Sequence, residues 1–149
     1  FIGLRFFTVF GELGRPDMFF FKMILSVFKN GKLYLNNSGN HYRDFTYIKD
    51  VVIILRKLIS LNVKNKYEIL NICSSRPIFL KNFIKISENY LKKINIVNVP
   101  LHPADVYKTH GSNIKLMKLI KKMKFTNLDT AIKNTIESYK KYKIHKQKN

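Results

Sequence analysis

Two arginines follow loops or turns, where the backbone could orient their side chains toward an anion. Arg15 ends a loop punctuated by glycines, and Arg43 follows a turn and precedes an aromatic segment. A guanidinium group can form two parallel hydrogen bonds with a carboxylate or a phosphate, which gives orientation as well as affinity. The residue type therefore makes both arginines candidates for binding an anion. The alternatives are a solvated loop arginine and a strand arginine paired with Asp44 or Asp50.

Other chemistry-bearing patterns in the chain are weaker. Tyr139 is followed four residues later by Lys143, but this spacing lies in a lysine-rich C-terminal stretch and we interpret it as coincidence. The two glycines of the segment 11–14 are only half of a Gly-rich phosphate loop. Cys73 has no histidine close to it in the sequence, so we interpret it as a small buried hydrophobe. We therefore predict neither catalytic residues nor metal ligands.

The elements that must position these residues alternate between strands and helices, which predicts an α/β fold. The apolar run 1–10, broken only by Arg5, is typical of a strand covered on both faces. We expect Ser112 to cap a short helix, and Thr126 with Asp129 to form a capping box. The remaining expected strands are 32–37, 42–48, 67–73 and 95–100, and the expected helices cover 17–30, 80–91, 112–120 and the stretches from 50 and from 126.

Composition limits the class of protein. The 149 residues suit one domain, and no apolar run reaches the roughly 18 residues of a membrane span. A single cysteine suits a reducing cytoplasm. The net charge of +19 could indicate a nucleic-acid binder, but its lysines are spread along the whole chain beside many Ile and Asn residues. We interpret the charge as compositional drift and keep a basic nucleic-acid-binding protein as the alternative from another class.

Four collinear motifs carry a resemblance to a known family. They are GLRFFTVFGELGRPDM, RDFTYIKDVV, NICSSRPIFL and HPADVYKT, and the similarity runs from residue 3 to about 142. The chain resembles the extended short-chain dehydrogenase/reductase family, which is the NAD-dependent epimerase/dehydratase group, and most of all the UDP-glucuronate 4-epimerases. The resemblance implies the C-terminal part of an extended Rossmann-type enzyme, with the last sheet strands and a small α/β substrate-binding lobe. Residues 143–149 would form a basic tail.

The same resemblance implies an activity and shows what this chain lacks. Family enzymes carry a Gly-rich phosphate loop and a Tyr-x-x-x-Lys pair, which we expect upstream of residue 1. The implied reaction is NAD-dependent interconversion of UDP-glucuronate and UDP-galacturonate at C4, with most of NAD bound by that upstream part. A UDP-glucose 4-epimerase or a nucleotide-sugar 4,6-dehydratase is the alternative. We expect no membrane partner, a full-length enzyme that can form a homodimer, and a 149-residue chain that is inactive alone.

Three residues at the first two motifs acquire roles by resemblance. Thr8 lies at a strand end, where ligands gather in α/β sheets, and would contact the sugar. Arg15 matches the arginine that binds the substrate carboxylate. Arg43 matches the arginine that binds the diphosphate.

The resemblance assigns the remaining residues less sharply. Asp105 would meet the ribose or the neighbouring backbone, and His102 would lie near the phosphates or at the surface. Phe6 would lie near the nicotinamide of NAD or pack in the core. Asn36 stands where many relatives place an aromatic ring against the uracil, so we expect uridine to be bound more weakly or by other contacts here.

Overall fold

The computed structural model describes residues 1–61, 67–101, 103 and 105–146. Its strands are β1 (Ile2–Phe6), β2 (Thr8–Phe10), β3 (Leu33–Asn36), β4 (Tyr42–Arg43), β5 (Phe45–Tyr47), β6 (Glu68–Ile72), β7 (Ile78–Phe79) and β8 (Ile96–Val99). Its helices are α1 (Phe19–Phe28), α2 (Ile48–Ile59), α3 (Leu80–Glu88), α4 (Ile114–Leu119) and α5 (Leu128–Lys146), with a short 3₁₀ turn, η1 (Asn37–Gly39). The boundary that the sequence suggests at residue 142 falls inside α5.

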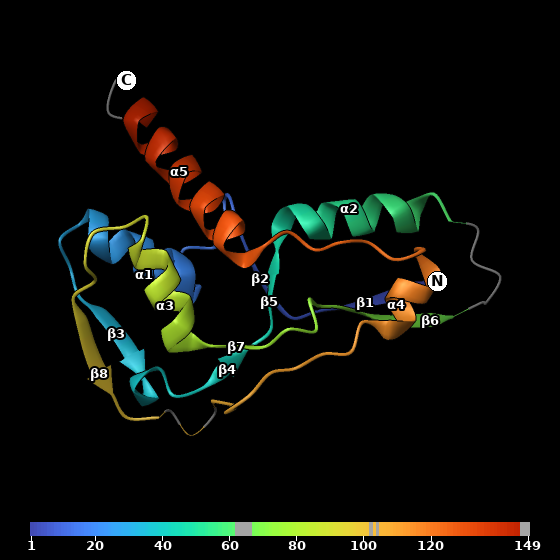
Figure 1. The fold of residues 1–149 in the computed structure, drawn as a ribbon, viewed down its shortest axis with the longest axis horizontal. Coiled ribbons are helices and arrows are strands. Elements are labelled where there is room, and N and C mark those ends of the chain that lie inside the picture. Colours follow the sequence, from blue (N-terminus) through green and yellow to red (C-terminus); the bar gives the residue numbers. More distant parts are fainter. Residues whose placement is uncertain (62–66, 102, 104, 147–149) are drawn as a thin grey trace.

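The strands form four pairs, three of them parallel. β1 pairs with β6, β2 with β5 and β3 with β8 in parallel, whereas β4 and β7 are antiparallel. Figure 1 shows β1 and β6 beside α2 and α4 at one end of the molecule, and β3 and β8 beside α1 and α3 at the other. The short strands β2, β5, β4 and β7 lie between the two ends. The parallel pairing and the interleaved helices confirm the predicted α/β class.

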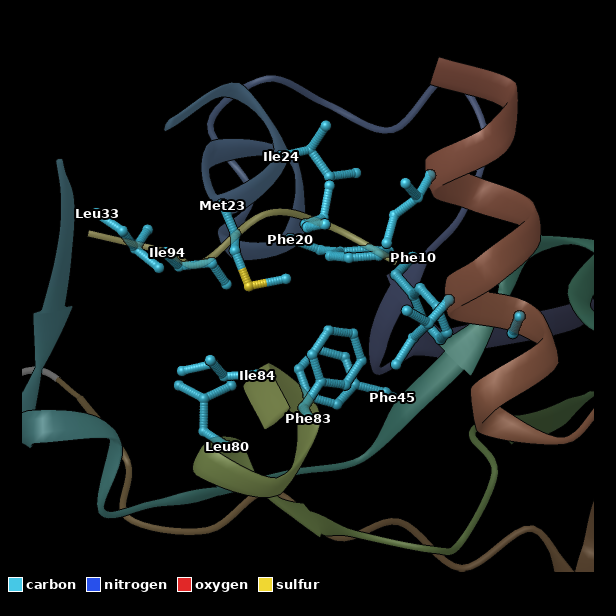
Figure 2. Close-up of a cluster of buried hydrophobic side chains, with 14 of the residues drawn as sticks. Phe10, Phe20, Met23, Ile24, Leu33, Phe45, Leu80, Phe83, Ile84 and Ile94 are labelled. Atoms are coloured by element: carbon cyan, nitrogen blue, oxygen red, sulfur yellow. The ribbon is translucent and has the colours of Figure 1, made fainter. Parts of the chain in front are cut away.

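The two ends of the molecule each have a cluster of buried side chains. The larger cluster surrounds Phe83, whose ring is stacked on Phe45 at 4.2 Å between centroids and meets Phe20 edge-on at 5.0 Å (Figure 2). The smaller cluster packs α2 and α4 against β1 and β6. Ile48, the first residue of α2, is packed against both clusters. The lobe around α1 and α3 and the β1–β6 end therefore have separate cores, and among the described residues Ile48 contacts both.

The expected single strand over residues 1–10 is wrong. It breaks at Phe7, whose N–H donates to the Ile72 carbonyl while its own carbonyl accepts from the Val9 N–H. The chain bends there because β1 pairs with β6 and β2 with β5. Burial on both faces is also wrong for the end of β1, because Phe6 is 51% exposed.

The expected strand over residues 42–48 also divides, at Asp44. β4 pairs with β7 and β5 with β2, and the side chain of Asp44 between them is fully buried. A carboxylate inside an aromatic run can be buried only with hydrogen-bond donors around it, so it interrupts the strand where those donors converge.

The two predicted helix caps differ from the observed ones. Asn113, not Ser112, precedes α4, and its side chain donates to the Cys73 carbonyl instead of capping the helix. At α5 the Asn127 Oδ1 accepts from the Asp129 N–H, and Thr126 instead binds Asp50. Which residue caps a helix therefore depends on hydrogen-bond partners from segments that are distant in the sequence.

Candidate functional site

A cavity of about 770 Å³ lies between α1, β3, β4 and the segment that carries Asp105. Three of the predicted site residues line it: Thr8, Arg43 and Asp105. Thr8 begins β2 and pairs in register with Phe45, which places it next to the β4–β5 junction. The structure therefore brings three of the six residues that sequence reasoning selected to one concave site.

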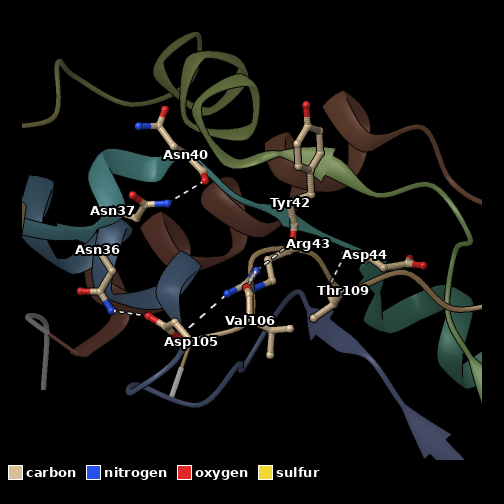
Figure 3. A network of polar contacts seen from close by, with 9 residues as sticks. All are labelled: Asn36, Asn37, Asn40, Tyr42, Arg43, Asp44, Asp105, Val106 and Thr109. Atoms are coloured by element: carbon tan, nitrogen blue, oxygen red, sulfur yellow. Dashed lines mark hydrogen bonds and ion pairs between the residues drawn. The ribbon is translucent and has the colours of Figure 1, made fainter. Parts of the chain in front are cut away.

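Arg43 is held firmly at the wall of this cavity. Its Nη1 donates to the carbonyls of Tyr42 at 2.8 Å and Val106 at 2.7 Å, and its Nη2 lies 4.0 Å from the Asp105 carboxylate (Figure 3). The side chain is 17% exposed, and burial lowers the pKa of the guanidinium, which the Asp105 charge opposes. An arginine nevertheless stays protonated in proteins, so the site keeps a fixed, oriented positive charge.

Asp105 faces Arg43 from the opposite wall. Its Oδ2 accepts a hydrogen bond of 2.8 Å from the Asn36 amide, at the end of β3 (Figure 3). Asn36 therefore orients a cavity carboxylate, a role that the sequence did not suggest. The aromatic ring on β3 belongs instead to Tyr34, which lines the cavity and is 64% exposed.

Arg15 lies outside the cavity lining. Its guanidinium forms a two-bond ion pair with Asp17, with Nε to Oδ1 at 3.0 Å and Nη2 to Oδ2 at 2.5 Å. The Arg15 side chain is 74% exposed, whereas Asp17 does line the cavity. Arg15 thus lies at the cavity edge, paired with a carboxylate of this chain, and its role toward a sugar carboxylate stays a prediction.

The other two predicted residues are placed differently. Phe6, at the carboxyl end of β1, is exposed and is not part of the cavity lining. His102 lies outside the described residues. The nicotinamide and phosphate roles of these two residues therefore stay predictions.

Sequence reasoning missed several cavity residues. His41 is buried, with 7% exposure, and its Nδ1 has no hydrogen-bond partner among the described residues. Burial and the nearby Arg43 charge lower the pKa of His41, which keeps the imidazole neutral near pH 7. The sequence signal that could have identified His41 is its position two residues before Arg43. The lysines that line the cavity are Lys22, Lys29 and Lys32.

Two other titratable side chains, Tyr139 and Cys73, serve the fold. Tyr139 packs against the rings of Phe21 and Phe28, and burial raises its pKa. Cys73 is fully buried, and burial raises the pKa of its thiol. Over the part of the chain that the structure describes, no group of three His, Cys, Asp or Glu side chains could hold a metal, and no helix is long and apolar enough to span a bilayer.

Known proteins resemble this chain over most of its length. Residues 1–73 match the model of the NAD dependent epimerase/dehydratase family. An uncharacterized protein of Methanocaldococcus jannaschii is 42% identical over 120 residues, which are 80% of this chain and 36% of that protein. A UDP-glucuronate 4-epimerase of Thermodesulfobacterium geofontis is 32% identical over 135 residues, or 89% of this chain and 41% of that enzyme.

A solved structure shows the same fold. It is the UDP-glucuronic acid 4-epimerase from Bacillus cereus in complex with UDP-glucuronic acid and NAD, and it matches with a TM-score of 0.85 at 23% identity. The match covers 93% of this chain and 45% of that one, which confirms the predicted extended Rossmann-type fold. The chain spans less than half the length of each of these three proteins. In sequence over residues 1–73, and in fold over nearly its whole length, the chain is therefore similar to the NAD dependent epimerase/dehydratase family and its epimerases.

Proposed function

We propose that this chain is the substrate-binding portion of an NAD-dependent nucleotide-sugar epimerase that interconverts UDP-glucuronate and UDP-galacturonate at C4. The observation that carries the proposal is Arg43, which two backbone carbonyls hold at the wall of a 770 Å³ cavity opposite Asp105. An oriented guanidinium in a half-buried site suits a diphosphate, and a carboxylate facing it suits the hydroxyl groups of a ribose. Residues 1–142 would form this portion.

The rest of the cavity fits a nucleotide of this kind. The exposed ring of Tyr34 offers a face on which a pyrimidine could stack, in place of the aromatic ring that many relatives carry at the position of Asn36. Lys22, Lys29 and Lys32 add positive charge to the lining. Charge of this sign raises the local concentration of an anionic ligand and speeds its association.

The residues present fit only the edge of an NAD site. Phe6 exposes its ring at the carboxyl end of a parallel strand, where cofactors bind in α/β sheets. Within residues 1–61, 67–101, 103 and 105–146 we find no Gly-rich phosphate loop with three glycines. NAD, when bound, would take a hydride from the sugar and return it. This chain would bind and orient the sugar nucleotide.

The carboxylated sugar is favoured by Arg15. Its pairing with Asp17 shows a guanidinium with the geometry for two parallel bonds to a carboxylate at the cavity edge. A sugar carboxylate would have to replace Asp17, at a site where exposure and solvent keep the existing pair weak. A neutral sugar, as in a UDP-glucose 4-epimerase or a 4,6-dehydratase, would make no use of this arginine.

Calorimetric titration of the 149-residue chain with UDP tests the proposal. Arg43→Ala should lower the affinity for UDP at least about tenfold, because a charge-assisted hydrogen bond contributes about 1.5–3 kcal/mol. Arg56→Ala is the matched control, since Arg56 is exposed on α2 and does not line the cavity. Absence of UDP binding by a folded chain, together with salt-sensitive binding of RNA or DNA, would instead favour the nucleic-acid alternative.

A further inference from the structure

Asp44 is a fully buried carboxylate that binds two segments distant in the sequence. Its Oδ1 accepts from the Ser74 N–H at 3.0 Å and from the Ser74 hydroxyl at 2.7 Å, and its Oδ2 accepts from the Gly111 N–H at 3.1 Å. Its own N–H donates to the Thr109 hydroxyl at 3.1 Å. One residue therefore joins the β4–β5 junction, the loop after β6 and the segment before α4.

The segment before α4 is the one that carries Asp105 to the cavity. Between β8 and α4 its described residues form no helix or strand, and they are held along β4. Tyr42 N–H donates to the Tyr107 carbonyl at 2.9 Å, and Thr109 N–H donates to the Tyr42 carbonyl at 3.2 Å. The contact of Asp44 with Thr109 (Figure 3) continues this series toward α4, and so does its contact with Gly111. They fix the far end of the segment.

Gly111 is confined on its other side. A Cβ atom at this position would lie 2.5 Å from the Cys73 sulfur and 2.7 Å from Cζ of Phe7, distances at which atoms overlap. The backbone therefore approaches the end of β6 as closely as a glycine allows. Its N–H meets the Asp44 carboxylate in that position, so Gly111 is held on both sides.

We propose that Asp44 is a positioning residue, which sets the distance between Arg43 and Asp105 across the cavity without touching the ligand. It neighbours Arg43 in the chain, and through Thr109 and Gly111 it holds the segment whose Val106 carbonyl binds Arg43 and whose Asp105 faces it. Both walls of the proposed diphosphate–ribose site thus depend on one buried carboxylate. The importance of this role for a ligand rests on the proposed function, but the positioning itself does not.

Asp50 is the matched comparator for this role. It is 2% exposed, and it also accepts from one backbone N–H and one hydroxyl, both of Thr126, at 3.0 and 2.7 Å. Its partner begins the connection into α5, and Asp50 does not line the cavity. Loss of either carboxylate should destabilise the chain, but only the loss of Asp44 should loosen the cavity walls.

Amide hydrogen exchange on Asp44→Asn and Asp50→Asn separates the two roles without any ligand. An amide group at position 44 cannot accept from both Ser74 and Gly111, because one of its two atoms becomes a donor. We expect the Tyr42 and Thr109 amides to exchange at least about tenfold faster in Asp44→Asn and to keep their rates in Asp50→Asn. Faster exchange restricted to Gly111 and Ser74, or equal changes in both variants, would overturn the positioning role.

A second pair of variants tests the same role if Asp44→Asn does not fold. Thr109→Val removes the acceptor of the Asp44 N–H without changing the side-chain shape, and Thr109→Ser restores the hydroxyl. Thr135→Val is the control, because the Thr135 hydroxyl binds only the Ala131 carbonyl inside α5 among the contacts described. We expect Thr109→Val to weaken UDP binding about three- to tenfold. The affinity for UDP should return to the wild-type value in Thr109→Ser and stay unchanged in Thr135→Val.

The two hypotheses fail in different ways. If the folded wild-type chain does not bind UDP, the proposed function is rejected, and the exchange rates of Tyr42 and Thr109 still decide the role of Asp44. If the wild-type chain binds UDP and both Asp44→Asn and Thr109→Val bind it equally well, the proposed function stands and the positioning role is overturned.

Discussion

Arg15 and Asp17 form a two-bond ion pair at the edge of the cavity, and only Asp17 lines it. The hydrogen bonds from Arg15 lower the pKa of Asp17, so the pair is fully charged near pH 7. A carboxylate of this chain thus occupies the position that we propose for the carboxylate of the sugar. Asp17 would compete with the ligand for Arg15.

Asp17→Asn should therefore strengthen the binding of UDP-glucuronate. The substitution leaves Arg15 without its anionic partner, so a sugar carboxylate no longer has to displace one. We expect about a two- to fivefold gain in affinity, in keeping with the small contribution of an exposed ion pair. Titration with UDP-glucose is the control, and its affinity should stay unchanged. An equal gain for both ligands would show that Arg15 does not recognise the carboxylate.

Tyr34→Ala should weaken the binding of UDP. Stacking of a base on an aromatic side chain contributes about 1–3 kcal/mol in nucleic-acid complexes, which corresponds to about five- to 150-fold in affinity. Fluorescence competition or calorimetry measures the change. Tyr67→Ala is the matched control, because Tyr67 is similarly exposed but does not line the cavity. Unchanged affinity in Tyr34→Ala would remove the ring from the proposed uridine site.

Glu12 should make the stability of the chain depend on pH in the acid range. Burial alone would raise the pKa of Glu12, but hydrogen bonds from Lys49 and Tyr47 outweigh it and hold the pKa below its ordinary value. Its contribution is therefore fully present above the ordinary glutamate pKa, about 4.3, and is lost as the pH falls through the lower folded-state pKa.

Urea unfolding at pH 7 and at about pH 3 measures this contribution. Glu12→Gln should lower the free energy of unfolding at pH 7 and reduce its fall on acidification. Glu137→Gln, at an exposed glutamate that lies 4.0 Å from Lys133, should leave both values nearly unchanged. The same pH dependence in Glu12→Gln and the wild-type chain would contradict the assignment.

Gly111→Ala should destabilise the chain and weaken UDP binding together. The added methyl group would overlap the Cys73 sulfur and the Phe7 ring, and overpacking of this kind costs about 1–3 kcal/mol. Gly3→Ala is the control, since a Cβ there would lie no closer than 3.7 Å to its neighbours and Gly3 does not line the cavity. Thermal unfolding and UDP titration on both variants test the prediction. A fully stable Gly111→Ala would mean that the segment has room to move.

The 149-residue chain with added NAD should bind UDP-glucuronate without epimerising it. The reaction needs a base and a hydride carrier, and two tyrosines of this chain, Tyr139 and Tyr90, have structural contacts. Tyr139 packs on Phe21 and Phe28, and Tyr90 donates to Asp129. Chromatographic separation of UDP-glucuronate from UDP-galacturonate is the assay. Turnover by the isolated chain would contradict the proposal that catalysis requires residues outside it.

Local patterns predicted the helices and several strands, but strand breaks required the tertiary structure. The spacing of Phe20, Ile24 and Val27 is sufficient to predict α1, because a helix needs only its own periodicity. The breaks at Phe7 and Asp44 depend on which strand lies alongside, and partners far away in the sequence decide that.

The candidate site was predicted in part for the same reason. Arg43 stood out because its residue type and the motif around it indicate anion binding. Its immobilisation by the Val106 carbonyl, 63 positions away, leaves no trace in the motif. Asn36 was judged as a missing aromatic residue, whereas the structure pairs it with Asp105 and places Tyr34 in the cavity. Residue type predicted the chemistry, and only folding showed the partners.

The contact of Ile48 with both buried clusters has a consequence for cooperativity. Each cluster is buried separately, so cooperative unfolding of the two depends on the few side chains that contact both, such as Ile48. Gly11 is packed closely against Ile48. A Cβ atom at position 11 would overlap the Ile48 side chain, so no larger residue fits at position 11. A loss of packing at Ile48 would therefore turn one unfolding transition into two, with the lobe that contains most of the cavity melting apart from the β1–β6 end.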